Sequence, residues 1–220
     1  MEAEYRDPRG LGRTAVLWLR IWLAAQISFG LASVYEFATL SGLPGDTPMT
    51  ISTSPPEAEL SDLVTGGTGI LNLLAFWVSG IIVLRWIHRV NANAQGFAGG
   101  MTVSPGWNVG WFFVPFANLI KPFQGVRETW QVSQGAPNWQ DEPVPVRLRW
   151  WWACWLVTNF IDNASFRLSL RSETVGDSVA IAGLNMASAI VSVPLGLLLI
   201  RLIRDLAEAQ DTLHSSLVFR

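Results

Sequence analysis

The sequence has little charge and few of the residues that form catalytic or metal sites. Only 15% of its 220 residues are charged, against about 25% in a typical soluble domain. A single cysteine, Cys154, excludes an intrachain disulfide and a multi-cysteine metal site. The two histidines, His88 and His214, lie far apart, and no catalytic triad order, phosphate-binding loop or paired-histidine motif is present. The sequence therefore gives little support to an enzyme, and we expect neither a cofactor nor a metal ion.

Apolar residues, by contrast, make up half of the chain and gather in long runs. A transmembrane helix needs about 20 mostly apolar residues. Four segments meet this length, and we expect each to span a membrane: residues 14–40, 64–90, 148–170 and 179–203. Twelve tryptophans stand against two tyrosines, and tryptophan favours the membrane–water interface. These patterns predict an all-α integral membrane protein with a single membrane domain over residues 1–220.

A fifth apolar segment, residues 105–132, differs from the other four because prolines and polar residues interrupt it. Pro115 and Pro122 break it, and Asn118 and Lys121 lie between or beside them. Proline removes a backbone donor and kinks a helix, and carbonyls freed in hydrocarbon need other partners. We expect this Pro/Trp-rich segment to form two short interfacial helical pieces or a shallow re-entrant hairpin on the cytoplasmic side. A true fifth span is the alternative.

The basic residues predict the orientation, because cytoplasmic loops carry an excess of lysine and arginine. Most of them flank the cytoplasmic ends of the expected spans, whereas Arg167 and Arg171 follow the third span: the flanking residues are Arg6, Arg9, Arg13, Arg85, Arg89, Lys121, Arg127, Arg147, Arg149, Arg201 and Arg204. The connection 41–62 carries acidic residues and neither lysine nor arginine, so we expect it to be an exterior loop. Both termini are then cytoplasmic, which requires an even number of crossings. Beyond Arg204 we expect a helix that leaves the membrane and frays.

Three stretches of the sequence resemble a known family: RWIHRVNANAQG, SPGWNVGWFFVPFANLIKPFQGVRETW and WWACW. They resemble the bacterial membrane-protein family called domain of unknown function 4328, over most of the chain from the second expected span onward. The resemblance implies an integral membrane protein of bacteria and no particular activity, and we expect the protein in the inner membrane. The motif positions singled out as functional candidates are Arg89, Asn93, Trp107, Trp111, Pro115, Asn118, Lys121, Pro122 and Arg127.

Two interpretations of the segment 105–132 stay open. In one, it lines a cytoplasm-facing cavity, where Asn118 and Lys121 lie near exposed carbonyls and Lys121 binds a lipid phosphate or another anion. In the other, it is a structural plug held at the interface by its tryptophans, and Lys121 extends to the lipid headgroups. Arg89 and Asn93 are four residues apart, so they share a helix face that can dock this segment.

Polar residues inside the expected spans form a second candidate site. Asn159, Asp162 and Asn163 cluster in the exterior half of the third span, and Glu36 lies at a similar depth in the first. Such residues often mark ion or proton pathways. The alternative is a polar clamp between helices, in which Asp162 pairs with a nearby arginine, Arg167 or Arg171.

The sequence is compatible with two functions. The first is a non-enzymatic accessory, scaffold or lipid-interacting component, because small residues in the second and fourth spans suit close helix packing. Its partners would be membrane lipids, with other membrane proteins or further copies of itself. The alternative is a small transporter or channel with a cavity lined by residues 105–132. Nucleic acid is not expected as a partner, since the arginines follow the topology and form no basic domain.

Overall fold

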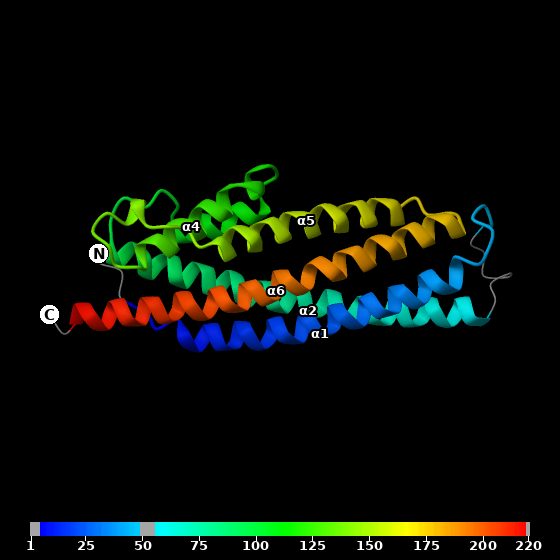
Figure 1. Ribbon diagram of the computed structural model, residues 1–220, viewed down its shortest axis with the longest axis horizontal. Helices are drawn as coiled ribbons and strands as arrows, with labels where there is room; N and C mark the ends of the chain where they lie inside the picture. The colour runs from blue at the N-terminus through cyan, green and yellow to red at the C-terminus, as the bar shows by residue number, and fades with distance from the viewer. Residues whose placement is uncertain (1–4, 49–55, 219–220) are drawn as a thin grey trace. The chain divides into compact units, whose positions relative to one another are not determined.

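The computed structural model describes residues 5–48 and 56–218, and the described chain is helical (Figure 1). The elements in chain order are α1 (Arg9–Leu40), α2 (Pro56–Phe97), α3 (Pro105–Gly110), the 3-10 turns η1 (Trp111–Phe113) and η2 (Ala117–Leu119), α4 (Lys121–Val132), the 3-10 turn η3 (Trp139–Asp141), α5 (Val146–Ser169) and α6 (Val175–Val218). The predicted all-α class is confirmed. An isolated bridge between Pro48 and Thr174 is the sole strand-like pairing in the described ranges.

Three helices are long and apolar enough to cross a membrane: α1 over Arg9–Leu40, α2 over Glu59–Phe97 and α6 over Val175–Val218. They contain the first, second and fourth predicted spans. Helix α5, with 24 residues, has the length of a span but carries the polar cluster Asn159, Asp162 and Asn163. The fourth crossing therefore stays a prediction.

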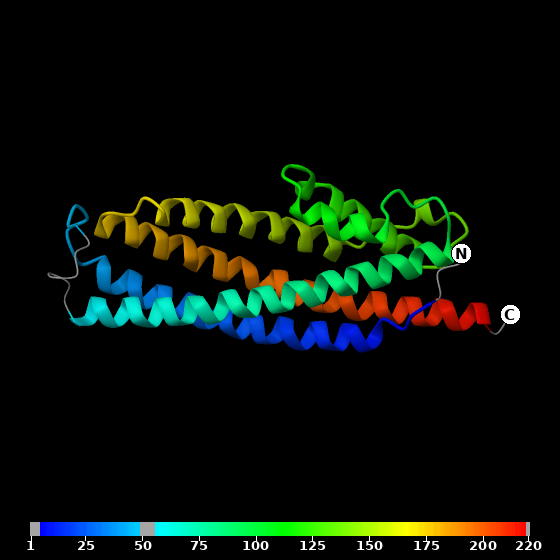
Figure 2. The same ribbon diagram turned by 180° about the vertical axis from the view of Figure 1, so that it is seen from behind.

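Helices α2 and α6 are much longer than the spans predicted inside them, and both are continuous ribbons in Figures 1 and 2. At 1.5 Å per residue, 42 and 44 residues correspond to about 63 and 66 Å. A hydrocarbon core is about 30 Å thick. The expectation of a fraying tail was wrong, because α6 continues to Val218 and buries Leu206 and Gln210.

The chain divides into two compact units. Unit 1 comprises Met1–Leu19, Val78–Trp152 and Leu197–Arg220, and unit 2 comprises Arg20–Trp77 and Ala153–Gly196. Each of the four long helices contributes to both. By sequence, twelve of the fifteen lysines and arginines fall in unit 1, against nine of the seventeen acidic residues. Unit 2 therefore carries a net negative charge.

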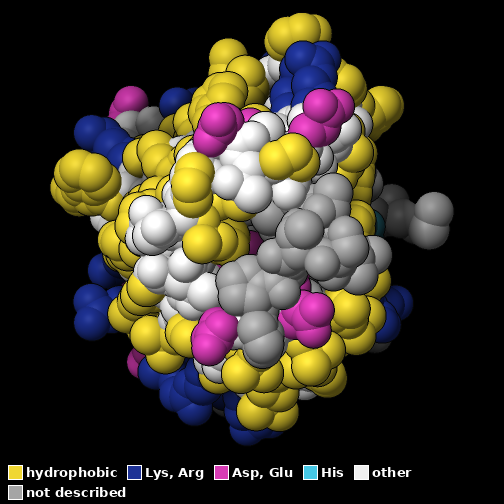
Figure 3. Space-filling view, turned by 90° about the vertical axis from the view of Figure 1, so that its right-hand side faces the viewer, with side chains coloured by type: hydrophobic (Ala, Val, Ile, Leu, Met, Phe, Trp, Pro, Cys, Tyr) yellow, Lys and Arg dark blue, Asp and Glu magenta, His cyan; other side chains and the backbone are white. Residues whose placement is uncertain are grey.

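Unit 2 consists of closely packed helices. A Cβ atom on Gly30 of α1 would lie 2.6 Å from the Cβ atom of Ala189 on α6, so the glycine permits this approach. At the loop end of unit 2, the amides of Val175 and Gly176 donate to the carbonyls of Thr47 and Gly45 at 3.0 and 2.9 Å. Figure 3 looks onto this end, where acidic side chains lie among neutral and apolar ones. Part of the expected exterior loop, residues 49–55, lies outside the described residues.

Candidate functional site

The interrupted segment Pro105–Val132 belongs to unit 1 and forms two helices, α3 and α4, separated by η1 and η2 (Figure 1). Pro105 and Pro122 occupy the first turns of α3 and α4, where a missing N–H costs little. These prolines therefore begin helices. The break lies between them at Phe116, whose φ of 63° places a bulky side chain on left-handed backbone.

Helix α4 is fixed to the preceding loop by a buried carboxylate. Glu128 is 3% exposed, and its Oε2 accepts hydrogen bonds from the amides of Thr102 and Val103 at 2.8 and 3.3 Å. The Thr102 hydroxyl donates to its Oε1, and Gln124 Nε2 donates to the same oxygen at 3.3 Å. These donors compensate the burial of the acid. Glu128 thereby attaches the middle of α4 to the loop that precedes α3.

Helix α3 packs against α4 where Asn108 faces Gly125. Asn108 is fully buried, and a Cβ atom added to Gly125 would lie 2.6 Å from Asn108 Cγ and collide with its Oδ1. Both polar atoms of the Asn108 side chain lack a hydrogen-bond partner among the described residues. A side chain at position 125 would therefore require Asn108 to move away from α4.

The break between α3 and α4 contacts the beginning of α5. Trp152 donates its indole N–H to the carbonyl of Leu119 at 3.1 Å. Its ring also lies 6.3 Å from that of Phe112 and 6.0 Å from that of Phe123, between centroids. Because Trp152 is six residues after Val146, this contact lies about 9 Å along α5. The break is therefore level with the second turn of α5.

Several large apolar side chains of this segment are exposed. The exposed fractions are 55% for Trp107, 65% for Phe113, 85% for Phe116 and 68% for Ile120. Trp107 stacks on Trp111 at 4.5 Å between ring centroids. A soluble surface rarely exposes so many large apolar groups in one short stretch, so the segment has the composition of a contact surface.

The other predicted residues of the segment make hydrogen bonds to residues close to them in the sequence. Lys121 is exposed and donates to Gln124 Oε1 at 3.3 Å. The carbonyl of Pro115 accepts the amide of Ala117 at 2.7 Å, and the amide of Asn118 donates to Val114 at 2.9 Å.

The candidate arginines are partly buried. The Nε of Arg127 is buried with no hydrogen-bond partner within the described ranges. Arg89 of α2 is half-buried. The structure therefore gives neither arginine a bonded contact with the break in the segment.

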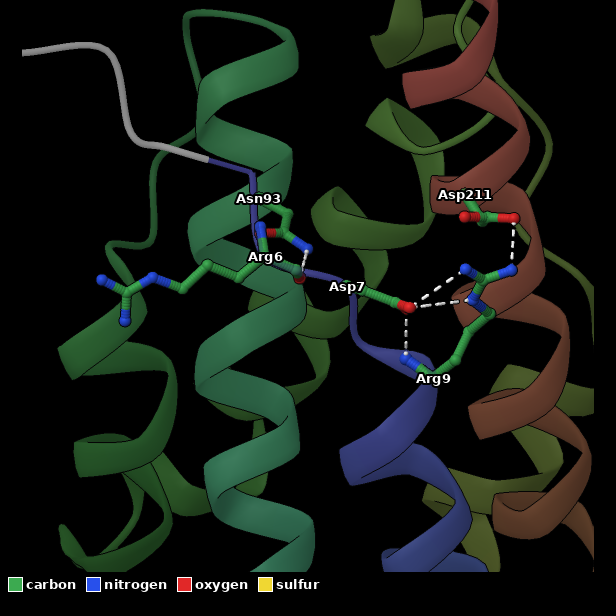
Figure 4. A network of polar contacts seen from close by, with 5 residues as sticks. All are labelled: Arg6, Asp7, Arg9, Asn93 and Asp211. Atoms are coloured by element: carbon green, nitrogen blue, oxygen red, sulfur yellow. Dashed lines mark hydrogen bonds and ion pairs between the residues drawn. The ribbon is translucent and has the colours of Figure 1, made fainter.

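Asn93 lies in a buried polar network of unit 1 instead of docking the segment. Its Oδ1 accepts the amide of Arg6 at 3.1 Å, and its Nδ2 donates to the carbonyl of Arg6 at 2.9 Å (Figure 4). Nδ2 also donates to Gln210 Oε1 at 3.0 Å. Gln210 Nε2 in turn donates to the carbonyl of Val90 at 2.7 Å and to Ser133 Oγ at 3.1 Å. The network joins the N-terminal segment, α2, α6 and the end of α4.

The N-terminal segment is also held by its side chains. Tyr5 stacks on His214 at 3.8 Å between centroids. Arg9 binds Asp211 at 2.7 Å and Asp7 at 3.0 Å (Figure 4). Burial, with the nearby negative charge of Asp211, raises the pKa of Tyr5 to about 12. The hydrogen bond from Arg9 lowers the pKa of Asp7 below its usual range.

In unit 2, the predicted polar cluster is divided between helices. Ser188 of α6 donates to Asp162 Oδ1 at 2.5 Å, and Arg167 Nε donates to Asn163 Oδ1 at 2.7 Å. Asn159 Nδ2 donates to the carbonyl of Trp155 at 2.7 Å. Glu36 of α1 is half-buried, and its Oε2 lacks a partner among the described residues.

Sequence reasoning missed most of the buried network in unit 1. Asn91 donates to Thr129 Oγ1 at 3.0 Å and thereby joins α2 to α4. From the sequence we expected this docking role of Asn93, two positions away. Glu128 was not among the candidates, because a charged residue by itself indicates an exposed position. Gln210 lay in the supposed fraying tail. Its four-residue spacing from Leu206 continues a buried face of α6, and that spacing could have revealed it.

Comparison with protein families matches residues 50–208 to the family described as domain of unknown function, DUF4328. The match covers α3, α4 and α5, and it confirms the resemblance inferred from the motifs. Gln210, Glu36 and the N-terminal segment lie outside the matched residues. Neither the curated proteins nor the solved structures gave a match.

Proposed function

The chain belongs to the family described as domain of unknown function, DUF4328, and on that premise we propose a function for it. It is a four-span protein of the bacterial inner membrane, non-enzymatic, which contacts lipid through the exposed apolar side chains of Pro105–Ile120. Unit 1 contains the cytoplasmic ends of the spans and both termini. The segment is interfacial and does not form a fifth span.

The length of α5 and the charge distribution support four crossings. At 1.5 Å per residue, the 24 residues of α5 correspond to about 36 Å, enough for a core of about 30 Å. Twelve of the fifteen basic residues fall in unit 1, as expected for its cytoplasmic placement. Both chain ends belong to this unit, which is consistent with an even number of crossings.

One observation carries the lipid-contact proposal. Trp107, Phe113, Phe116 and Ile120 are exposed on a segment too short to span a membrane. The contact between Leu119 and Trp152 lies about 9 Å along α5. Interfacial elements bury their apolar face by about 5–10 Å. Lys121, at the end of this stretch, is exposed and able to reach lipid phosphates.

The transporter alternative gains no support from the space beneath α4. An apolar cavity lined by Val126, Trp130, Trp86 and Leu206 has a volume of about 10 Å³. A water molecule needs at least roughly 10–15 Å³ and polar partners. This cavity is therefore part of a packed interior.

The depth of Phe116 tests the proposal directly. We would place a nitroxide at Phe116→Cys in a Cys154→Ala background, in lipid nanodiscs, and compare collision rates with oxygen and with a water-soluble nickel complex. We expect oxygen to dominate at position 116 and nickel to dominate at the control Gln134→Cys, which is exposed beyond α4. Equal nickel access at both positions would refute lipid contact.

Reporter fusions test the topology separately. A reporter inserted after Gly45 and one at the C-terminus should lie on opposite sides of the membrane. The same side for both would refute the four-span arrangement. This outcome does not depend on where the segment Pro105–Ile120 lies.

A further inference from the structure

The outer half of α5 exposes polar side chains on one face. Asn159, Asp162 and Asn163 are exposed, and Phe166 is 62% exposed on the same face. The side of α5 that is buried carries Thr158 and Ser165. Polar and charged residues inside a membrane almost always face protein or a water-filled cavity, because contact with lipid is costly. If α5 is a span, as proposed above, this face does not suit lipid, and a covering protein surface would remove it from lipid.

The bonds made by these residues leave charges unpaired. Asp162 receives one hydrogen bond, from Ser188 at 2.5 Å, and no cation pairs with it across residues 5–48 and 56–218. Arg167 is exposed, and its Nε donates to Asn163 Oδ1 at 2.7 Å. The guanidinium group is thus directed one turn toward the N-terminus of α5, to about the depth of Asp162.

We propose that this face binds the same face of a second copy of the chain, with the two α5 helices parallel about a two-fold axis. In this arrangement Arg167 of each copy pairs with Asp162 of the other. A two-fold interface repeats every contact, so one helix face with both an acid and a base is complementary to itself. The proposal rests on α5 being a span, because in water these side chains need no cover.

The side-chain amides of this face also favour a second copy of the chain as the partner. Asn159 and Asn163 are one turn apart on the exposed side, and each retains hydrogen-bonding groups that its own bond does not use. Asparagine side chains hydrogen-bond across helix pairs in membranes. A second copy supplies these groups at the same depth, together with the opposite charge. A partner of different sequence would need to match all four polar groups independently.

Cysteine cross-linking in native membranes tests the proposal. The full chain, in a Cys154→Ala background, would carry either Asn159→Cys or the control Ala164→Cys, and copper phenanthroline would supply the oxidant. Position 164 is exposed on the same helix but lies about 140° around it. We expect a disulfide-linked dimer from Asn159→Cys at several times the yield from Ala164→Cys. Equal yields at the two positions, or a cross-link to a different protein, would overturn the proposal.

The charge pair is tested in the Asn159→Cys background. Asp162→Asn should weaken association by roughly five- to tenfold, seen as a lower cross-linked fraction at matched expression. The double reversal Asp162→Arg with Arg167→Asp should restore it, because each copy again offers both charges. A C-terminal fluorescent reporter monitors insertion of every variant. Yields that do not respond to Asp162→Asn in inserted protein would refute the pairing.

Labelling by a membrane-impermeant maleimide separates this proposal from the function on which it rests. If α5 is a span, Ala164→Cys should be protected in intact membranes and should react after detergent is added. Rapid labelling in intact membranes would refute both the fourth span and the pairing. Protection at position 164 without a cross-link at position 159 would refute the pairing alone.

Discussion

Among the described residues, the side-chain hydrogen bonds with the largest sequence separations lie in unit 1. In unit 1, Gln210 and Asn93 bond across elements that are far apart in the sequence. In unit 2, Ser28, Ser33 and Thr68 donate to carbonyls of their own helix, at 3.0, 3.0 and 2.7 Å. The bonds between helices in this unit, such as Ser165 to Asn185 and Ser188 to Asp162, span only 20 and 26 positions. A hydroxyl bonded to its own helix needs neither water nor a neighbour, which suits a lipid environment.

The packing of the helices differs in the same way. Unit 2 brings backbones together at small residues, as Gly30 and Ala189 show. Unit 1 also uses a glycine, Gly125, but sets it against the buried amide of Asn108. The same continuous helices therefore pack against a buried side-chain amide in unit 1 and against a small residue in unit 2. Substitutions at matched positions can break or sharpen this contrast.

The largest effect is expected from Gln210→Ala. The change leaves the amide of Asn93 and the carbonyl of Val90 without their partner in a buried site, which should cost about 3 kcal/mol of local stability. Hydrogen exchange of α2 residues 85–97 should then accelerate by roughly a hundredfold. Gln134→Ala removes an exposed glutamine from the same unit and should change little. Similar acceleration in both variants would mean that the network does not stabilise unit 1.

A second effect is expected at the contact between α3 and α4. Gly125→Ala should destabilise unit 1 by about 2 kcal/mol, because overpacking outweighs the gain of up to about 1 kcal/mol in helix propensity. Gly106→Ala is the control, since its Cβ would meet nothing within 4 Å, and it should be neutral or stabilising. Chemical unfolding in mild detergent measures both. A Gly125→Ala protein as stable as the control would show that Asn108 moves aside freely.

A smaller effect is expected in unit 2 from Gly30→Ala. The new Cβ would lie 2.6 Å from Ala189 Cβ, and both atoms are fixed to helix backbones, so α1 and α6 must separate. We expect a loss of about 1 kcal/mol, because dispersion contacts between these helices weaken. Gly66→Ala, with open space around it, serves as the control in the same unfolding assay. No difference between the two would refute close packing as the basis of unit 2.

The helices that cross unit 2 were predictable because a membrane requires a long apolar run, and such a run is visible in the sequence alone. The interrupted segment was predictable for the same reason: Pro115, Pro122 and Lys121 do not suit a span. The sequence did not show what each proline does to the backbone. Pro122 begins α4, and the backbone reverses at Phe116, which no local rule singles out.

The polar interior of unit 1 could not be predicted, because its partners are distant in the sequence. Asn93 and Gln210 are 117 residues apart, and neither residue type indicates burial by itself. Glu128 illustrates the difficulty, since a charged residue on an amphipathic helix is normally assigned to the solvent face. Only the amides of Thr102 and Val103, brought beside it by the loop, make its burial favourable.

The smallest effect concerns the attachment of the N-terminal segment to unit 1. Burial raises the pKa of Tyr5 from 10.0 to about 12, so the neutral phenol stabilises the attachment fully below pH 10, and this contribution is lost as pH rises through 12. Ultraviolet titration of the wild type and of Tyr5→Phe, which retains Tyr35, should differ by one tyrosine that ionises near pH 12. Ionisation of that tyrosine near pH 10 would mean that its stacking on His214 leaves the hydroxyl in water.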